Sequence, residues 1–146
     1  MLSDVLKLQV IDAFADECRK VSDIEFVQVN PIETPQLDML STPALFIWDR
    51  EGDEKEFRNR LEVVNVPLAL QLWVEGTDYE RRSENIRGQI QEKIYTSLTL
   101  KDFNAGARDI SGVKFYGEQD LIGGIDIRYQ LQFLSNTMDP FSQLNY

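Results

Sequence analysis

The sequence predicts an α+β domain, with a single mostly antiparallel sheet and two helices on one face, in the order α-β-β-β-α-β-β. Apolar residues recur at three- and four-residue intervals in two segments, which indicates helices, and alternate with polar residues in several others, which indicates strands. The expected strands come in runs separated by a helix, an order typical of α+β domains. We expect residues 1–134 to form this single domain and residues 135–146 to form a C-terminal tail used in contacts.

The first helix is predicted over residues 3–19. Ser3 or Asp4 is suited to cap its start, and an apolar stripe runs from Leu6 to Cys18. Basic residues follow the stripe, where they complement the negative end of the helix dipole.

Three strands are expected before the second helix. The first covers residues 24–29 and leads into a proline-bearing loop over 31–43. The second, residues 44–48, is nearly all apolar, so we expect it to be covered on both faces. The third runs from Phe57 to about Glu75 and carries an alternating apolar face.

The charge-dense segment 49–56 connects the second and third of these strands. We expect a protruding charged hairpin with this segment as its solvated tip. The start of the segment is similar to a calcium loop, but glycine occupies the fourth position instead of the sixth and Arg60 occupies the twelfth. A solvated tip that contacts a partner is therefore favoured over a metal site.

The third strand contains two irregular features. Pro67 has no N–H to donate to a ladder, which predicts that the strand is partly an edge or pairs fully only after this residue. Val63 has the opposite phase to the apolar face that begins at Val64, which predicts a bulge or bend between them.

The second helix is predicted over residues 79–97, with a buried ridge of Ile86, Ile90 and Ile94. A linker over 99–109 is expected after it. Two more strands follow, at 110–116 and 125–133, joined by a turn region that contains Gly117, Gly123 and Gly124. The last strand alternates without interruption, and its apolar face is expected to carry the isoleucine ridge.

Composition excludes several classes of site. The chain has no histidine, which removes the usual general base, and its only cysteine, Cys18, forms no internal disulfide. We predict no catalytic, cofactor-binding or metal site. The formal net charge of −10 disfavours sequence-independent binding of DNA. No membrane span or secretion signal is recognised, so we expect a cytoplasmic start.

The order of parts resembles that of the tail terminator proteins of long-tailed bacteriophages and the related tail-completion or neck proteins. The resemblance covers nearly the whole chain: an N-terminal helix, a proline-bearing loop, the strand Thr42–Trp48, a charged hairpin, the strand Val66–Val74, a helix, and the strand Gly124–Leu131. It is a similarity of layout, without a diagnostic motif.

The resemblance implies a structural virion protein that is not an enzyme. Such a tail terminator caps the tail tube, stops its polymerisation and provides the head-joining surface. Its partners are copies of itself in a hexameric ring, the tail tube protein, and a head–tail connector or neck protein. DNA passes through the lumen without specific binding, and the protein is found in the virion tail or neck after assembly in the host cytoplasm. The alternatives are a head-side neck or minor capsid protein, or an acidic metal-dependent enzyme or regulator.

Two segments are expected to make the contacts of the ring. Both carry charged or apolar side chains that no predicted element buries. They comprise Arg50, Glu51, Asp53, Glu54, Lys55, Glu56 and Phe57 in the charged segment, and Phe141, Leu144 and Tyr146 in the tail.

Overall fold

Two long antiparallel strands form the centre of the structure. β4 (Leu61–Glu75) and β7 (Ile122–Asn136) each have 15 residues and pair along their whole length, from Leu61 opposite Asn136 to Glu75 opposite Ile122. Every other strand lies beside one of these two, directly or through one neighbour. The computed structural model describes residues 2–31, 42–50, 52–58, 61–110, 114–119 and 122–136.

Each central strand has two short partners on its other side. β2 (Ala44–Asp49) and β3 (Glu54–Arg58) follow one another along β4. β5 (Ala105–Asp109) and β6 (Lys114–Gln119) lie in the same way along β7. β1 (Phe26–Val29) pairs with β2 and is the only parallel neighbour among the described strands. The described strands form one seven-stranded sheet with the path β1-β2-β4-β7-β5.

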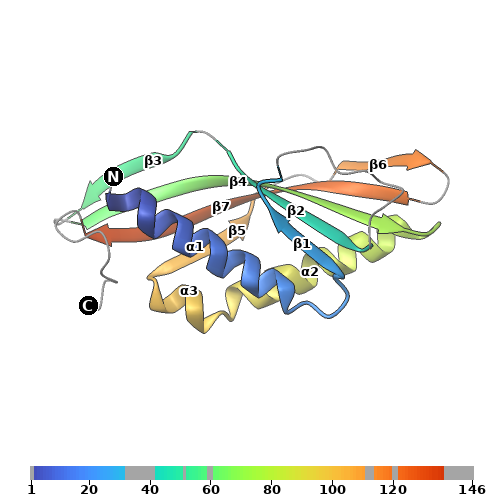
Figure 1. Cartoon of the computed structure of the whole chain (residues 1–146), viewed down its shortest axis with the longest axis horizontal. Coiled ribbons are helices and arrows are strands. Elements are labelled where there is room, and N and C mark those ends of the chain that lie inside the picture. Colours follow the sequence, from blue (N-terminus) through green and yellow to red (C-terminus); the bar gives the residue numbers. More distant parts are fainter. Residues whose placement is uncertain are drawn as a thin grey trace.

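The three described helices lie on the same side of this sheet (Figure 1). α1 (Leu2–Arg19) and α2 (Tyr79–Tyr95) contact each other and the sheet, and the short α3 (Leu98–Asp102) lies against β5 and α1. Ser97 caps α3, since its hydroxyl accepts a hydrogen bond from the backbone N–H of Leu100 at 3.1 Å. Within the described part of the chain, no helix combines the length and apolar content needed to cross a membrane.

The main core of the described residues lies between the helices and the sheet. The predicted ridge of Ile86, Ile90 and Ile94 is buried there together with the apolar face of β7, and α2 packs on β7. The α+β class, the mostly antiparallel sheet and the placement of two helices on one face are therefore confirmed. The core includes Leu6, Val10, Phe14, Cys18, Leu45, Ile47, Val64, Val66, Leu68, Leu70, Leu72, Val74, Ile125, Ile127, Tyr129, Leu131 and Phe133.

The charged hairpin is present, but its arms are not those predicted. β2 and β3 do not pair with each other; both pair with β4, and the hairpin consists of β3 and β4. The segment from Asp49 to Asp53 connects two consecutive partners of β4 and is not the tip of the hairpin. The predicted third strand is thus two strands, because the chain reverses direction between Arg58 and Leu61.

Pro67 lies where β2 gives way to β3. Its carbonyl accepts a hydrogen bond from the N–H of Arg50 at 3.1 Å, so its missing donor faces the gap between the two short strands. The partial-edge prediction therefore holds for one side of β4 only, because β7 pairs with the other side throughout. The predicted bulge at Val63–Val64 is wrong: both ladders run through this point without a shift, and Val63 simply belongs to the other face.

The predicted linker over 99–109 contains α3 and β5. Gly123 and Gly124 lie inside β7 and not in a turn, opposite Val74 and Trp73. A Cβ atom at Gly123 would overlap the ring of Tyr79, and one at Gly124 would be 3.0 Å from the ring of Trp73. These glycines therefore allow aromatic side chains to lie directly on the strand.

An ion pair joins α2 to β5. Arg87 Nε lies 2.5 Å from Asp109 Oδ2, and the Asp109 side chain is only 1% exposed. The hydrogen bond to Asp109 raises the pKa of Arg87 despite partial burial. Because a buried carboxylate without its cation is costly, this pair fixes the edge strand β5 to the helix layer.

We expect Arg87→Ala to lower the free energy of unfolding by about 3 kcal/mol, because the substitution removes the guanidinium group that pairs with the buried carboxylate of Asp109. Urea denaturation followed by circular dichroism measures the change. Arg81→Ala on the exposed face of α2 is the matched control and should change stability by less than about 0.5 kcal/mol. Equal effects of the two substitutions would contradict a structural role for the pair.

Candidate interaction surface

The face of the sheet opposite the helices, here called the outer face, is not covered by any described helix (Figure 1). Its side chains come from alternate positions of the strands whose other positions form the core. Aromatic residues gather on it near β1 and β2, and amide side chains gather on it between β4 and β7.

The aromatic part is a second, small apolar cluster. The ring centroids of Phe46 and Trp48 on β2 are 6.0 Å apart. The ring centroid of Phe26 on the neighbouring strand β1 also lies 6.0 Å from that of Phe46. Trp73 on β4 belongs to the same cluster. Its indole N–H donates to Gln71 Oε1 at 2.8 Å. Both tryptophans therefore pack on the outer face and not in the main core, and Phe26 stays 41% exposed at the rim.

The amide part surrounds Asn65. Its side-chain oxygen accepts hydrogen bonds from Gln130 Nε2 at 3.3 Å and from Gln132 Nε2 at 3.0 Å. A shallow hollow of about 360 Å³ lies beside these amides, and Gly106, Ala107 and Arg108 of β5 complete its lining. Neutral amides and one arginine offer hydrogen bonds but no general acid or base near neutral pH, so this hollow suits recognition better than catalysis.

The charged segment is held to the N-terminal half of α1 by one lysine. Lys7 Nζ lies 3.0 Å from Asp49 Oδ2 and 2.5 Å from Asp53 Oδ2. Burial lowers the pKa of Lys7, but the hydrogen bonds that its ammonium group donates to Asp53 and Asp49 outweigh this effect, and the net pKa is raised above its ordinary value of 10.5. Two of the carboxylates in the calcium-like sequence thus bind an ammonium group within the chain. The described residues contain no cluster of three or more metal-ligating side chains.

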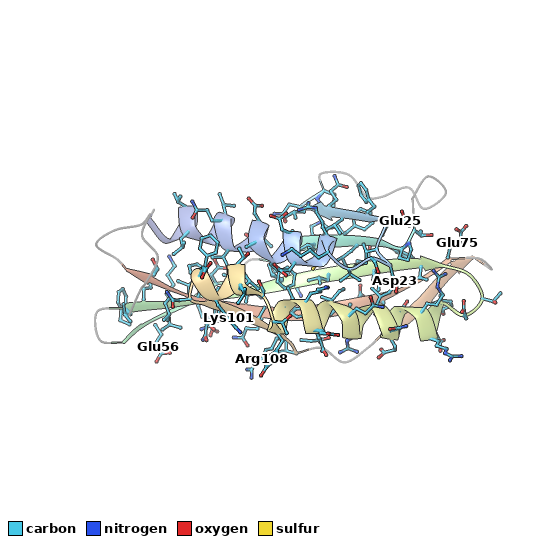
Figure 2. All side chains as sticks on the ribbon, turned by 90° about the horizontal axis from the view of Figure 1, so that it is seen from below. Asp23, Glu25, Glu56, Glu75, Lys101 and Arg108 are labelled. Atoms are coloured by element: carbon cyan, nitrogen blue, oxygen red, sulfur yellow. The ribbon has the colours of Figure 1, made fainter. Side chains whose placement is uncertain are left out.

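The predicted contact residues separate into three groups. Asp53 is tied to Lys7, whereas Phe57 is 67% exposed on β3. Figure 2 shows Glu56, its neighbour, at one end of the molecule, far from Glu75 at the other end. The exposed residues of the segment are Arg50, Glu54, Lys55, Glu56 and Phe57. Glu51, Phe141, Leu144 and Tyr146 lie outside the described residues, so their proposed contacts stay predictions.

The sequence did not predict a groove between α2 and β5. This groove has a volume of about 420 Å³ and is lined by Gly88 and Tyr95 of the helix and by Ala107 of the strand, among others. Tyr95 is 84% exposed at its rim. The buried side chain of Tyr129 lies at its base, and burial raises the pKa of the tyrosine so that its hydroxyl stays protonated. The available sequence signal for this groove was that Gly88, Glu92 and Tyr95 are spaced four and three residues apart. This spacing alone does not predict the groove, because the prediction also requires that β5 be recognised as a strand.

No protein-family model matches this sequence, and comparison with curated proteins finds no match either.

We expect Lys7→Met to lower the free energy of unfolding by about 1–3 kcal/mol at pH 7, because it leaves Asp49 and Asp53 side by side without a cation. Since the pKa of Lys7 is raised by folding, the pair stabilises the protein fully below pH 10.5 and loses this contribution as the pH rises further.

The difference between wild type and Lys7→Met should therefore shrink above pH 10.5 in urea denaturation. Lys93→Met is the control, since Lys93 is exposed on α2. A difference that is absent at pH 7, or that is constant up to pH 12, would contradict the proposed role of Lys7.

Proposed function

We propose that this protein is a structural component of a long-tailed bacteriophage, a tail terminator that acts as a ring at the end of the tail tube. In this role the ring stops polymerisation of the tube, provides the surface for head joining, and surrounds the channel through which DNA passes. The proposal rests on the layout of the chain and on the surfaces described above.

The observation that carries the proposal is the one-sided sheet. Helices pack on one face, whereas the other face carries amides, an arginine and a rim of aromatic side chains. The hollow beside Asn65 is lined by amide side chains and one arginine, which offer hydrogen bonds to a partner. A broad, mixed polar and aromatic surface is the kind that protein interfaces use.

Charge supports a channel that DNA passes without being held. With 15 basic and 25 acidic residues, the protein carries a formal net charge of −10. Binding of DNA to a protein surface gains most of its free energy from basic side chains that replace counterions at the phosphates. An acidic ring lacks this gain, so DNA in its lumen remains free to move.

We expect the purified protein to form rings, either alone at high concentration or on the ends of tail tubes. Sedimentation velocity and negative-stain imaging detect the rings, and a hexamer is the expected state. Added at substoichiometric amounts to polymerising tail tube protein, it should shorten the tubes. A strictly monomeric profile, both alone and with tubes, would overturn the proposal.

The alternatives give different outcomes in the same experiment. Binding to the head–tail connector but not to the tube would indicate a head-side neck protein. Calorimetry with Mg²⁺, Mn²⁺ and Ca²⁺ tests the remaining class, an acidic metal-dependent protein. Tight binding that Asp49→Ala and Asp53→Ala both abolish would overturn the structural role of the charged segment.

Phe57 offers a test of the predicted contact segment. Because its ring is 67% exposed, Phe57→Asp should leave the unfolding midpoint nearly unchanged and should weaken ring formation by at least about tenfold in the assembly constant. Sedimentation equilibrium measures the assembly constant. Glu80→Ala, an exposed substitution on α2, is the control. Unchanged assembly of Phe57→Asp would remove this residue from the interface.

A further inference from the structure

One edge of the sheet, β5, has backbone groups that pair with no described strand. The N–H of Ile110 donates to Arg128 on β7, and antiparallel ladders alternate, so the groups of Arg108 and Gly106 also face β7. Those of Ala105 and Ala107 therefore point away from the sheet, at the end of the strand path. An edge of this kind is a template for another strand.

The side chains of β5 leave space on both sides of this edge. Ala105 and Ala107 are small, and a Cβ atom at Gly106 would meet nothing within 4 Å. The groove against α2 lies on the helix side of Ala107, and the hollow beside Asn65 lies on its outer side. A strand added to β5 would place alternate side chains in these two spaces.

The opposite edge, β1, has the complementary shape. The N–H of Asn30 donates to Ile47 on β2, so the backbone groups of Val27 and Val29 point away from β2. Both valines are only half-buried, and Phe26 is 41% exposed. Figure 2 places Glu25, which directly precedes β1, and Arg108 of β5 at opposite long margins of the molecule.

We propose that β1 of one copy pairs with β5 of the next, so that the sheet continues from subunit to subunit. β1 runs antiparallel to β5 within one chain. A rotation that relates neighbouring copies and keeps the strand direction therefore leaves β1 of one copy antiparallel to β5 of the next. The two surfaces differ, so the contact is heterologous, the type of contact from which closed rings are built. This inference rests on the proposed ring function and specifies the interface.

Side-chain fit selects one register. With Val27 opposite Ala107 and Val29 opposite Ala105, the branched side chains fill the groove beside α2. Phe26 then lies opposite Arg108 on the outer face, where the guanidinium and the ring attract each other. Large side chains thus meet small ones on the helix side, and the exposed aromatic of β1 gains a cationic partner.

The contact also defines the inclination of the strands. The centre of β1 is level with Leu72 of β4, whereas the centre of β5 is level with Val66. This offset of about 20 Å, over about 24 Å of sheet width per subunit, inclines the strands by about 40° to the ring axis. Closed sheets commonly have strands inclined by about 35–45°.

A paired cysteine variant tests the register. In the proposed pairing Gln28 and Gly106 are opposite each other at a non-hydrogen-bonded position, with Cα atoms about 4.5 Å apart, which a disulfide can span. Gln28 is exposed, and Gly106 has space for a side chain. The native Cys18 can stay, since it is fully buried and burial raises the pKa of its thiol to about 12.

Under mild oxidation, full-length Gln28→Cys/Gly106→Cys should give a covalent ladder up to the ring size on non-reducing gels. The yield should be at least about tenfold that of either single variant or of the shifted pair Gln28→Cys/Arg108→Cys. Rings that form without such a ladder overturn the proposed edge contact but leave the terminator function intact. A chain that is monomeric alone and on tubes overturns both proposals.

Discussion

The full-length pairing of β4 with β7 determines the rest of the structure. Two 15-residue strands in unbroken register give a central ribbon that is longer than any of their partners. Each side of this ribbon is therefore lined by two short strands in succession, β2 and β3 on β4, and β5 and β6 on β7. Pro67 lies at one of the resulting junctions, where its lack of an N–H is tolerated.

The ribbon also gives the sheet two different faces. Alternate residues of β4 and β7 build the core under α1 and α2, and the residues between them form the outer face. Two charged contacts attach the helix layer to the sheet. Lys7 binds the segment between β2 and β3, and Arg87 binds β5. The helices are thus held on one side, and the outer face and the edge strands remain available for other subunits.

Much of this fold follows from periodicity in the sequence. The alternation from Ile125 to Phe133 and the isoleucine ridge of α2 predicted a buried contact, which the structure confirms. β5 was not predicted because Ala105, Gly106 and Ala107 have low strand propensity. They form a strand because they pair with β7. The separation of β3 from β4 was missed because no glycine marks the turn. The ion pair between Lys7 and Asp49 was not predicted. The available signal was that Lys7 interrupts an apolar stripe.

The candidate surface was less accessible to sequence analysis than the fold. Exposure of Phe57 was expected, but the open backbone of Ala107 and the half-buried Val27 depend on strand pairing that one sequence does not reveal. Hydrogen exchange measured on dilute and on assembled protein is the most direct test of the account. We predict that the amides of Val27, Val29, Ala105 and Ala107 become protected on assembly while those at the exposed start of α2 do not change. Assembled rings in which both edge strands exchange as fast as in the monomer would contradict the account.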